Sequence, residues 1–205
     1  MKKTTILPVP AILLAAGISA RLGAGNKLLL PLGGVSVIRR TCRNILASRV
    51  SELIVVTGFE HRKVARELEG LPVRICRNPD YREGMAASIR VGKTALPAGA
   101  SGVLILLADQ PNLQPETINK FIRRFRRGDK KIIAAELNGQ IRNPALFAAD
   151  FFPKLTQLRG KEGARKLLKK YHDEITAISV PAEQLIDIDT REDYERLKAI
   201  TEDTR

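Results

Sequence analysis

The feature that most constrains this chain is an apolar run, residues 9–15, that breaks into a glycine-rich loop. The run is too short to cross a membrane and too uniformly apolar for a strand with one face in water, so it predicts a buried strand of a parallel sheet. The loop carries two cationic side chains, Arg21 and Lys27. Its three glycines let the backbone turn tightly and direct several N–H groups at one anion: Gly17, Gly23 and Gly25. The segment therefore predicts a phosphate-binding loop for a nucleoside triphosphate.

Other interpretations of this segment are open from the sequence. Its spacing matches neither the Walker A motif nor GxGxxG, and a plain glycine-rich connection has the same composition. Lys2 and Lys3 precede the apolar run as they would in a secretory signal, but Pro8 and Pro10 interrupt its apolar core. Cleavage after the run would remove the strand that presents the loop. We therefore expect a cytoplasmic protein.

Apolar runs alternate with segments of helical periodicity along most of the chain. Strands are predicted at residues 52–57, 73–77, 103–107, 131–137 and 175–180. Helices are predicted at residues 36–48, 60–68, 85–96 and 116–127. Asn138-Gly139 predicts a tight turn. The alternation predicts an α/β fold over a single domain, residues 1–205: a Rossmann-like three-layer sandwich whose mostly parallel sheet has helices on both faces.

The net charge of +13 raises the question of a nucleic-acid partner. Much of the excess lies on two predicted amphipathic helices, around residues 120–131 and 161–170, where it forms the solvated face. Aromatic residues make up 4% of the chain and tryptophan is absent, so little can stack on single-stranded bases. We expect no nucleic-acid partner and no membrane association. Cys42 and Cys76 lack metal-ligand spacing and are expected to be buried thiols in a reducing compartment.

Asp109 is the most informative carboxylate in the sequence. It ends a strongly apolar predicted strand and is followed by Gln110-Pro111. The proline stops the strand and stiffens the turn, so the carboxylate is held at the ligand edge of the sheet. Capping of the next helix explains Asp109 poorly, because several residues intervene. Opposite a phosphate-binding loop, Asp109 is the candidate Mg²⁺ ligand.

A further acidic pair, Asp187 and Asp189, follows the predicted strand at residues 175–180. Either carboxylate is a candidate for metal binding beside Asp109. Equally, Asp189 or Thr190 would serve as the N-cap of the last helix. The sequence leaves both interpretations open.

The motifs of this chain resemble those of the nucleotidyltransferases related to molybdenum cofactor guanylyltransferase. The opening loop resembles their activated-nucleotide loop, with Leu14-Ala15-Ala16-Gly17-x-Ser19-x-Arg21-x-Gly23 and then Asn26-Lys27. Later motifs resemble the molybdenum cofactor cytidylyltransferase branch, in order Asn78-Pro79-Asp80, Glu83-Gly84-Met85 with Ser88, Asp109-Gln110-Pro111, Asn143-Pro144, Glu162-Gly163-Ala164-Arg165 and Asp187-Ile188-Asp189-Thr190. Ala-Ala-Gly in the opening loop also resembles the cytidine-using relatives. The resemblance covers nearly the whole chain.

This resemblance implies a nucleotide-diphospho-sugar transferase-like fold and the transfer of CMP from CTP to molybdopterin carrying molybdenum, with Mg²⁺ or Mn²⁺ as the cofactor. A molybdoenzyme that receives the product is an implied partner. The implied catalytic residues are Arg21, Lys27 and Asp109, and the implied metal ligands are Asp109 and Asp189. The implied nucleotide-binding residues are Leu14, Ala15, Ala16, Gly17, Ser19, Arg21, Gly23, Lys27, Asn78 and Ser88. The implied acceptor-binding residues are Gln110, Pro111 and Asn143.

Two departures from the family pattern concern the acceptor. Ala86 and Ala87 stand where relatives often carry more glycine and hydroxyl residues, which leaves Ser88 as the local hydroxyl. Arg142 stands where the pattern often has a glycine, so a contact between arginine and phosphate would replace close approach of the backbone. Two alternatives therefore stay open: a nucleotidyltransferase for another phosphorylated small molecule, such as a sugar or polyol phosphate, and a noncatalytic protein that delivers a cofactor.

Overall fold

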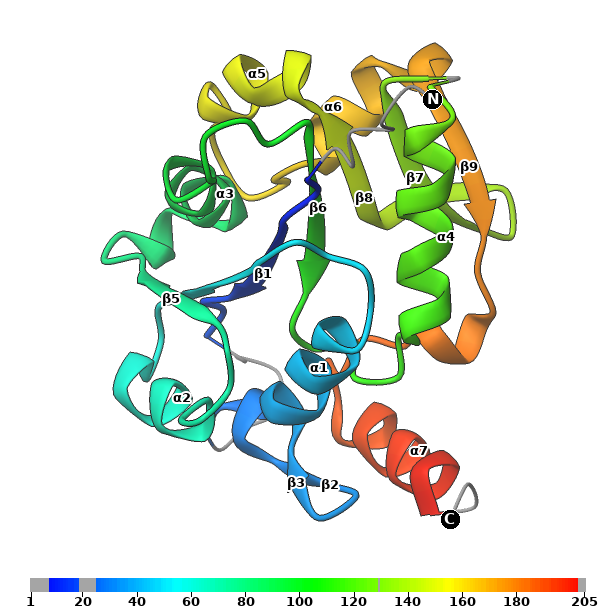
Figure 1. Cartoon of the computed structure of the whole chain (residues 1–205). Helices are drawn as coiled ribbons and strands as arrows, with labels where there is room; N and C mark the ends of the chain where they lie inside the picture. The colour runs from blue at the N-terminus through cyan, green and yellow to red at the C-terminus, as the bar shows by residue number, and fades with distance from the viewer. Residues whose placement is uncertain (1–7, 19–24, 129, 203–205) are drawn as a thin grey trace, which may run out of the picture.

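Seven strands form one sheet in the order β5-β4-β1-β6-β8-β7-β9 (Figure 1). The computed structural model describes residues 8–18, 25–128 and 130–202. The strands of the sheet are β1 (Ala11–Ala15), β4 (Leu53–Thr57), β5 (Arg74–Arg77), β6 (Gly102–Leu107), β7 (Ile132–Leu137), β8 (Gln140–Ala148) and β9 (Ile175–Ser179). β8 runs antiparallel to β6 and β7, and the other neighbours in the sheet are parallel. The predicted mostly parallel sheet is confirmed.

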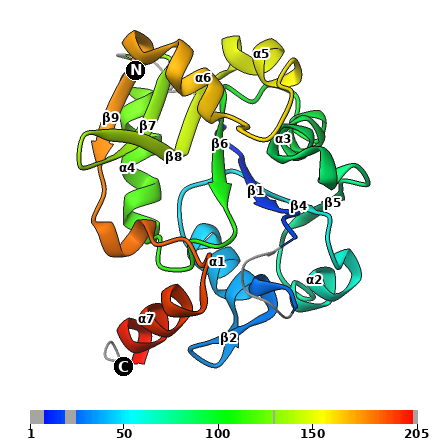
Figure 2. The same ribbon diagram turned by 180° about the vertical axis from the view of Figure 1, so that it is seen from behind.

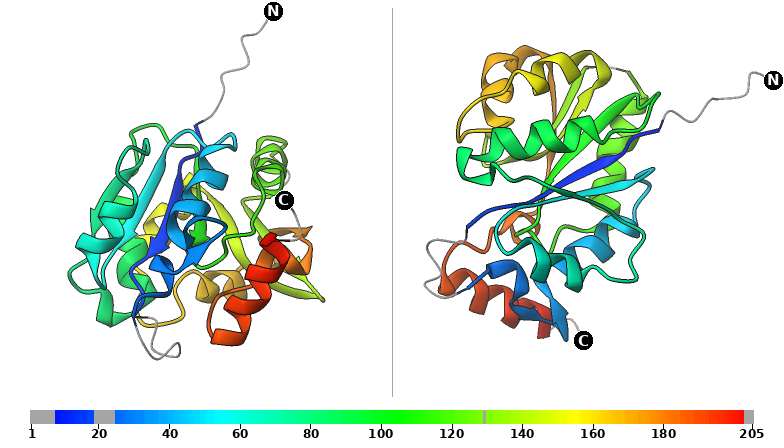
Figure 3. Two further views of the ribbon diagram at one scale, coloured as in Figure 1. Left: turned by 90° about the horizontal axis from the view of Figure 1, so that it is seen from below. Right: turned by 90° about the vertical axis from the view of Figure 1, so that its left-hand side faces the viewer.

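Helices cover both faces of this sheet because its central strands are apolar on both sides. On one face, α1 (Val37–Leu46), α2 (His61–Glu67) and α4 (Pro115–Arg126) share a core with alternate residues of β1, joined by α7 (Arg191–Glu202). On the other face, α3 (Met85–Thr94), α5 (Phe152–Thr156) and α6 (Arg165–Lys170) share a second core with Ile12 of β1 and with residues of β6 and β8 (Figure 2). Two further views show the same three layers (Figure 3). The predicted three-layer α/β sandwich is confirmed.

Short elements complete the chain at the edges of the sheet. An antiparallel pair, β2 (Pro31–Leu32) and β3 (Val35–Ser36), leads into α1. The 3₁₀ helices are η1 (Lys27–Leu29), η2 (Tyr81–Glu83), η3 (Ala149–Phe151), η4 (His172–Glu174) and η5 (Ala182–Leu185). Among the described residues, no helix combines the length and the apolar character that a membrane crossing requires.

The two helices that carry much of the positive charge are amphipathic, as predicted. In α4, Ile118, Phe121 and Ile122 are buried, and several of its basic residues face outward. In α6, Leu167 and Leu168 are buried in the same way. The basic faces are therefore the sides that these helices turn away from the core.

β8 departs most from the predicted structure. Asn143 and Pro144 both lie within this strand, and the peptide bond between them is cis. The pairing with β7 passes from Ala134 opposite Ala145 to Ala135 opposite Arg142, so Asn143 and Pro144 are the extra residues of a bulge. Proline has no N–H to give to the ladder, and it is tolerated there because the extra residues of a bulge are unpaired.

Two local features test finer expectations. Asn138 and Gly139 have φ of 52° and 75° and join β7 to β8, which confirms the predicted tight turn. Cys42 is buried in α1, and burial raises the pKa of its thiol to about 12. The prediction of burial is wrong for Cys76, which is half-buried because β5 is the edge strand of the sheet.

Candidate functional site

A cavity of about 410 Å³ opens at the carboxyl ends of β1 and β6, and we call it the first cavity. The two strands are neighbours, with Leu14 opposite Leu107, and the sheet continues from β1 through β4 on one side and from β6 through β8 on the other. A change of winding direction of this kind is where open α/β sheets bind ligands. Four of the predicted nucleotide-binding residues line the cavity at the end of β1: Leu14, Ala15, Ala16 and Gly17.

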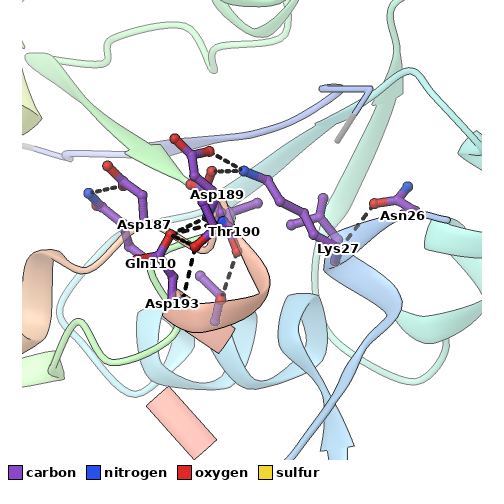
Figure 4. Close-up of polar contacts among 11 residues, drawn as sticks. Asn26, Lys27, Gln110, Asp187, Asp189, Thr190 and Asp193 are labelled. Atoms are coloured by element: carbon purple, nitrogen blue, oxygen red, sulfur yellow. Dashed lines mark hydrogen bonds and ion pairs between the residues drawn. The ribbon is translucent and has the colours of Figure 1, made fainter. Parts of the chain in front are cut away.

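One ammonium group lies between two carboxylates in the first cavity. Lys27 Nζ is 3.1 Å from Asp189 Oδ1 (Figure 4). It is also 2.5 Å from Asp109 Oδ2. Lys27 begins η1, whose N-cap Asn26 accepts a hydrogen bond from the backbone N–H of Leu28. Asp109 follows β6, and Asp189 precedes α7. Three segments far apart in the sequence thus bring a cation and two anions to one point.

The charge of Lys27 is secured by these partners. Burial alone would lower its pKa, but the charges and hydrogen bonds of Asp109 and Asp189 together raise the pKa above its usual value. The side chain of Lys27 is 14% exposed and that of Asp109 is 19% exposed, so the pair is only partly screened by water. The site therefore holds a permanent cation beside two anions.

The donor set at this point fits a hard divalent cation that shares its coordination with phosphate. Mg²⁺ prefers oxygen ligands and is bound by one or two carboxylates together with substrate phosphates and water. Asp109 and Asp189 supply two such carboxylates, already directed at a single positive charge. The described part of the chain has no group of three or more His, Cys, Asp or Glu side chains placed to hold a metal. Phosphate oxygens would have to complete the coordination.

The capping interpretation of the acidic pair is settled in favour of Thr190. The backbone N–H of Asp193 donates to Thr190 Oγ1 at 3.2 Å, and the backbone N–H of Thr190 donates to Asp193 Oδ2 at 2.8 Å. This reciprocal pair is a capping box at the start of α7. Ile188 N–H also donates to the carbonyl oxygen of Asp109 at 3.1 Å, which ties the segment to the end of β6. Asp189 is thereby left to face Lys27.

Ser88 and Asn78 lie together at the wall of the first cavity. Ser88, in the first turns of α3, lines the cavity and accepts a hydrogen bond from Asn78 Nδ2 at 3.0 Å. Asn78 is 1% exposed and also accepts from the backbone N–H of Asp80 at 3.0 Å. Asn78 therefore holds Ser88 and the loop after β5, and it does not line the cavity.

A second cavity of about 610 Å³ adjoins the first and shares Met85, Leu107 and Lys161 with it. Of the predicted acceptor-binding residues, Gln110 and Asn143 line this cavity. Pro111 lines neither cavity; it is buried, and its carbonyl oxygen accepts from Asn44 Nδ2 at 3.0 Å. The bulge in β8 brings Asn143 to the cavity, since bulges redirect side chains.

The wall of the second cavity is rich in cations. Arg142, Arg165, Lys169 and the shared Lys161 all line it, along with the carboxylates of Glu162 and Asp187. Lys169 is paired with Glu162 at 3.1 Å on the exposed rim. The sequence assigned the basic segment at residues 161–170 to a solvated helix face, but three of its cationic side chains line the cavity: Lys161, Arg165 and Lys169. A small anion is the ligand that such a wall favours.

Asp187 belongs to the second cavity rather than the first. Its Oδ1 accepts a hydrogen bond from Gln110 Nε2 at 2.9 Å (Figure 4). Burial raises the pKa of Asp187 to about 6, and the neighbouring charge of Asp109 adds to that effect, while the bond from Gln110 opposes it. Asp187 is thus a half-buried carboxylate held by the amide of Gln110.

Three residues with polar or charged side chains line the first cavity but were not predicted from the sequence: Tyr81, Arg82 and Lys161. Tyr81 and Arg82 line it, with the guanidinium carbon of Arg82 5.5 Å from the centre of the Tyr81 ring. Lys161 enters because the chain beside Gly160 packs against Gly84: a Cβ on Gly84 would lie 2.9 Å from the Cα of Lys161. The glycines on both sides of this contact were the available signal. The predicted nucleotide-binding residues Ser19, Arg21 and Gly23 lie outside the described residues.

Comparison with known sequences places the chain among nucleotide-transferring proteins. A family model described as a MobA-like NTP transferase domain matches residues 11–175. The purine catabolism protein PucB of Bacillus subtilis is 32% identical over 200 residues, which cover 91% of this chain and 94% of PucB. The molybdenum cofactor cytidylyltransferase of Escherichia coli is 28% identical over 197 residues, which cover 91% of this chain and 93% of that enzyme.

Solved structures agree with that placement. A nucleotidyl transferase from Methanothermobacter superimposes with a TM-score of 0.84 and 25% identity, covering 97% of this chain and 99% of that one. The manganese complex of Rv0371c from Mycobacterium tuberculosis superimposes with a TM-score of 0.79 and 25% identity, covering 94% of this chain and 98% of that one.

Proposed function

Because the chain belongs to the MobA-like NTP transferase family and is a nucleotidyltransferase of that type, we propose that it transfers CMP from CTP to the terminal phosphate of molybdopterin carrying molybdenum. The products are molybdopterin cytosine dinucleotide and pyrophosphate. Similarity to the cytidylyltransferase of Escherichia coli over most of both chains supports this choice of acceptor. The similarity to PucB is higher, so the acceptor is the part of the proposal that the experiment below tests first.

The observation that carries the proposal is the pair of adjoining cavities. A transferase must bring two substrates together at one reacting atom, and here the cavities meet at Met85, Leu107 and Lys161. The first cavity offers Lys27, Asp109 and Asp189 to a triphosphate. The second offers a cationic wall to a phosphorylated acceptor.

The chemistry asks for positioning and charge neutralisation rather than for a strong base. An acceptor phosphate is already ionised at neutral pH, and its oxygen attacks the α-phosphorus of CTP as the bond to pyrophosphate breaks. In the proposal, Asp109 and Asp189 hold Mg²⁺ or Mn²⁺, which supplies charge neutralisation at the phosphate oxygens. Lys27 exchanges its contacts with the two carboxylates for contacts with the leaving pyrophosphate. Arg21 also neutralises charge on the pyrophosphate.

The proposal gives the remaining predicted residues supporting roles. Ala15, Ala16 and Gly17 form the wall beside the nucleotide, and the Ala-Ala-Gly sequence favours CTP by resemblance. Ser88 donates its hydroxyl hydrogen to a phosphate, because its oxygen already accepts from Asn78. Asn143 and Gln110 contact the acceptor. The cell compartment in this proposal is the cytoplasm.

The test is pyrophosphate release with Mg²⁺ across CTP, GTP, ATP and UTP, each with and without molybdopterin carrying molybdenum. Release that requires CTP and molybdopterin together is the expected result. Release with CTP and a sugar or polyol phosphate in place of molybdopterin would keep the enzyme class and change the acceptor. Binding of nucleotide with no release under any pairing would replace the enzyme by a noncatalytic carrier.

A further inference from the structure

The side-chain amide of Gln110 is buried, and only its NH₂ group has a hydrogen-bond partner among the described residues. The residue is 3% exposed, and its Nε2 donates to Asp187 Oδ1 at 2.9 Å. Its Oε1 is buried and has no hydrogen-bond partner among the residues that the structure describes. Buried polar atoms are almost always paired, so an unpaired carbonyl oxygen at a cavity wall points to a missing ligand.

Asp187 fixes which end of the amide faces the ligand. An ionised carboxylate only accepts hydrogen bonds, so it selects the NH₂ end of Gln110 and leaves the oxygen on the other side. Both residues line the second cavity. The orientation of Gln110 is therefore set by its carboxylate neighbour and not by free rotation of the amide.

A second unpaired oxygen lies in the same cavity. Asn143 Oδ1 is buried and has no hydrogen-bond partner within the described ranges. It is carried by the bulge of β8. Two carbonyl oxygens that only accept hydrogen bonds call for a ligand with N–H or O–H donors, since a phosphate group would present further acceptors to them. The phosphate belongs instead to the cationic part of the wall, with Arg142, Arg165 and Lys169.

We infer that Asp187 is a positioning residue that holds Gln110 Oε1 ready to accept an N–H from the edge of the acceptor's heterocycle. This inference rests on the proposed function, in which the acceptor carries a pterin ring. The pterin edge with the ring N3–H and the 2-amino group supplies adjacent donors of the required kind. Asp187 is then separate from the metal-binding carboxylates, consistent with its place in the second cavity.

The test measures binding of two fluorescent probes to the full chain. One probe is pterin, and the other is its N3-methyl, 2-dimethylamino derivative, which lacks the donors on that edge. The wild-type protein should bind pterin about tenfold more tightly than the derivative, the effect of one well-placed hydrogen bond. Asp187→Asn allows the Gln110 amide to turn over, and Gln110→Met removes the oxygen. Both variants should lose the tenfold preference while retaining their affinity for CTP.

A matched control separates orientation from charge. Glu162→Gln removes one negative charge from the same cavity without touching the bond to Gln110, and it should keep the tenfold preference. Thermal unfolding of each variant reports whether it is folded, and Gln110→Met provides an independent test if Asp187→Asn is not.

Several outcomes would overturn the inference. If the wild-type protein binds both probes equally, or binds neither, it has no site that recognises the N–H donors on the pterin edge. An Asp187→Asn variant that keeps the preference but needs far more Mg²⁺ to bind CTP would make Asp187 a metal ligand. A protein that transfers CMP to molybdopterin yet shows no preference keeps the proposed function and loses this inference. Conversely, a protein that shows the preference without transfer would support this inference and overturn only the proposed function.

Discussion

Individual side chains determine what the first cavity accepts. Lys27 stands at the point where two carboxylates converge, and its contacts with Asp109 and Asp189 are those that a divalent cation would make. The sequence indicated Asp109 because a carboxylate at the end of a buried strand has few structural uses. It could not show that Lys27 pairs with Asp109, because that contact depends on how η1 packs against the sheet.

Replacing Asp109 directly tests the cluster of Lys27, Asp109 and Asp189. Asp109→Asn keeps the size of the side chain but removes a charge from the proposed metal site, so turnover should fall at least about a hundredfold. Steady-state pyrophosphate release at saturating CTP measures this loss, and circular dichroism checks the fold. Asp150→Asn is the matched control, because Asp150 is an exposed carboxylate paired with Lys131 away from both cavities. Undiminished turnover in Asp109→Asn would remove Asp109 from the metal site.

Gly84 allows the backbone of Lys161, a residue that lines both cavities, to pack closely against it. Its φ of 106° and ψ of −175° lie in a region that only glycine occupies readily, and an added Cβ would meet the backbone of Lys161. Gly84→Ala should therefore destabilise the protein by about 3 kcal/mol and raise the KM for CTP. Denaturant unfolding and initial rates measure the two effects.

A second glycine separates backbone strain from the lost contact. Gly99 has a φ of 78° with no atom within 4 Å of a built Cβ, so Gly99→Ala should cost about 1 kcal/mol and leave the KM unchanged. Equal losses in the two variants would show that the contact with Lys161 contributes nothing.

At the scale of helices and strands, the elements whose formation depends mainly on their local sequence were predictable. Apart from the short strands β2 and β3 and the 3₁₀ helices, the strands and helices up to β7 follow from apolar runs and helical periodicity, and their observed ends differ from the predicted ones by a few residues. β8 was not predictable in the same way, because its pairing includes a bulge at Asn143 and Pro144. A proline inside a strand is explained only by the partner strands, which the local sequence does not reveal.

The capping box of α7 gives a stability prediction with a defined dependence on pH. Hydrogen bonds from Thr190 and from the backbone of Asp189 lower the pKa of Asp193. A lowered pKa in the folded state means that the carboxylate contributes stability above its unfolded pKa and loses that contribution as the pH falls through the folded pKa. Asp193→Asn should cost about 1 kcal/mol near neutral pH.

Urea unfolding of wild-type and Asp193→Asn proteins across an acidic pH series measures that gap. The difference in unfolding free energy should close at pH values below the lowered pKa of Asp193. A gap that stays constant throughout the series would mean that the charge of Asp193 makes no contribution to the cap.

At the scale of the whole molecule, the order of strands places both cavities along one edge of the sheet. The first cavity lies where β1 and β6 are neighbours, and the second lies beside it toward β8. The position of a ligand site at the strand ends was predictable from the alternation of elements. The presence of two adjoining cavities was not predictable, since Lys161, which lines both, comes from a loop far along the sequence from β1 and β6.

Nucleotide binding should stabilise the entire fold, because a ligand that binds only the folded chain shifts the unfolding equilibrium. With Mg²⁺ present and CTP at about 100 times its Kd, the gain is about 2.7 kcal/mol. For a chain of this length the Tm should rise by roughly 5–10 °C. Differential scanning fluorimetry with CTP and with GTP at equal concentration measures the effect. A larger rise with GTP would contradict the preference for cytidine.

The two cavities also divide the chain itself. Most of the described lining of the first cavity comes from residues up to Asp109, and most of the second comes from Gln110 onward, including residues 139–143 of the hairpin that joins β7 to β8. In the proposed function, the nucleotide site and the acceptor site are thus formed by consecutive stretches of the chain. If the proposed function holds, a graft of that hairpin from one relative to another would change the acceptor and leave the nucleotide site as it was, so relatives with different acceptors could arise by changes in one short segment.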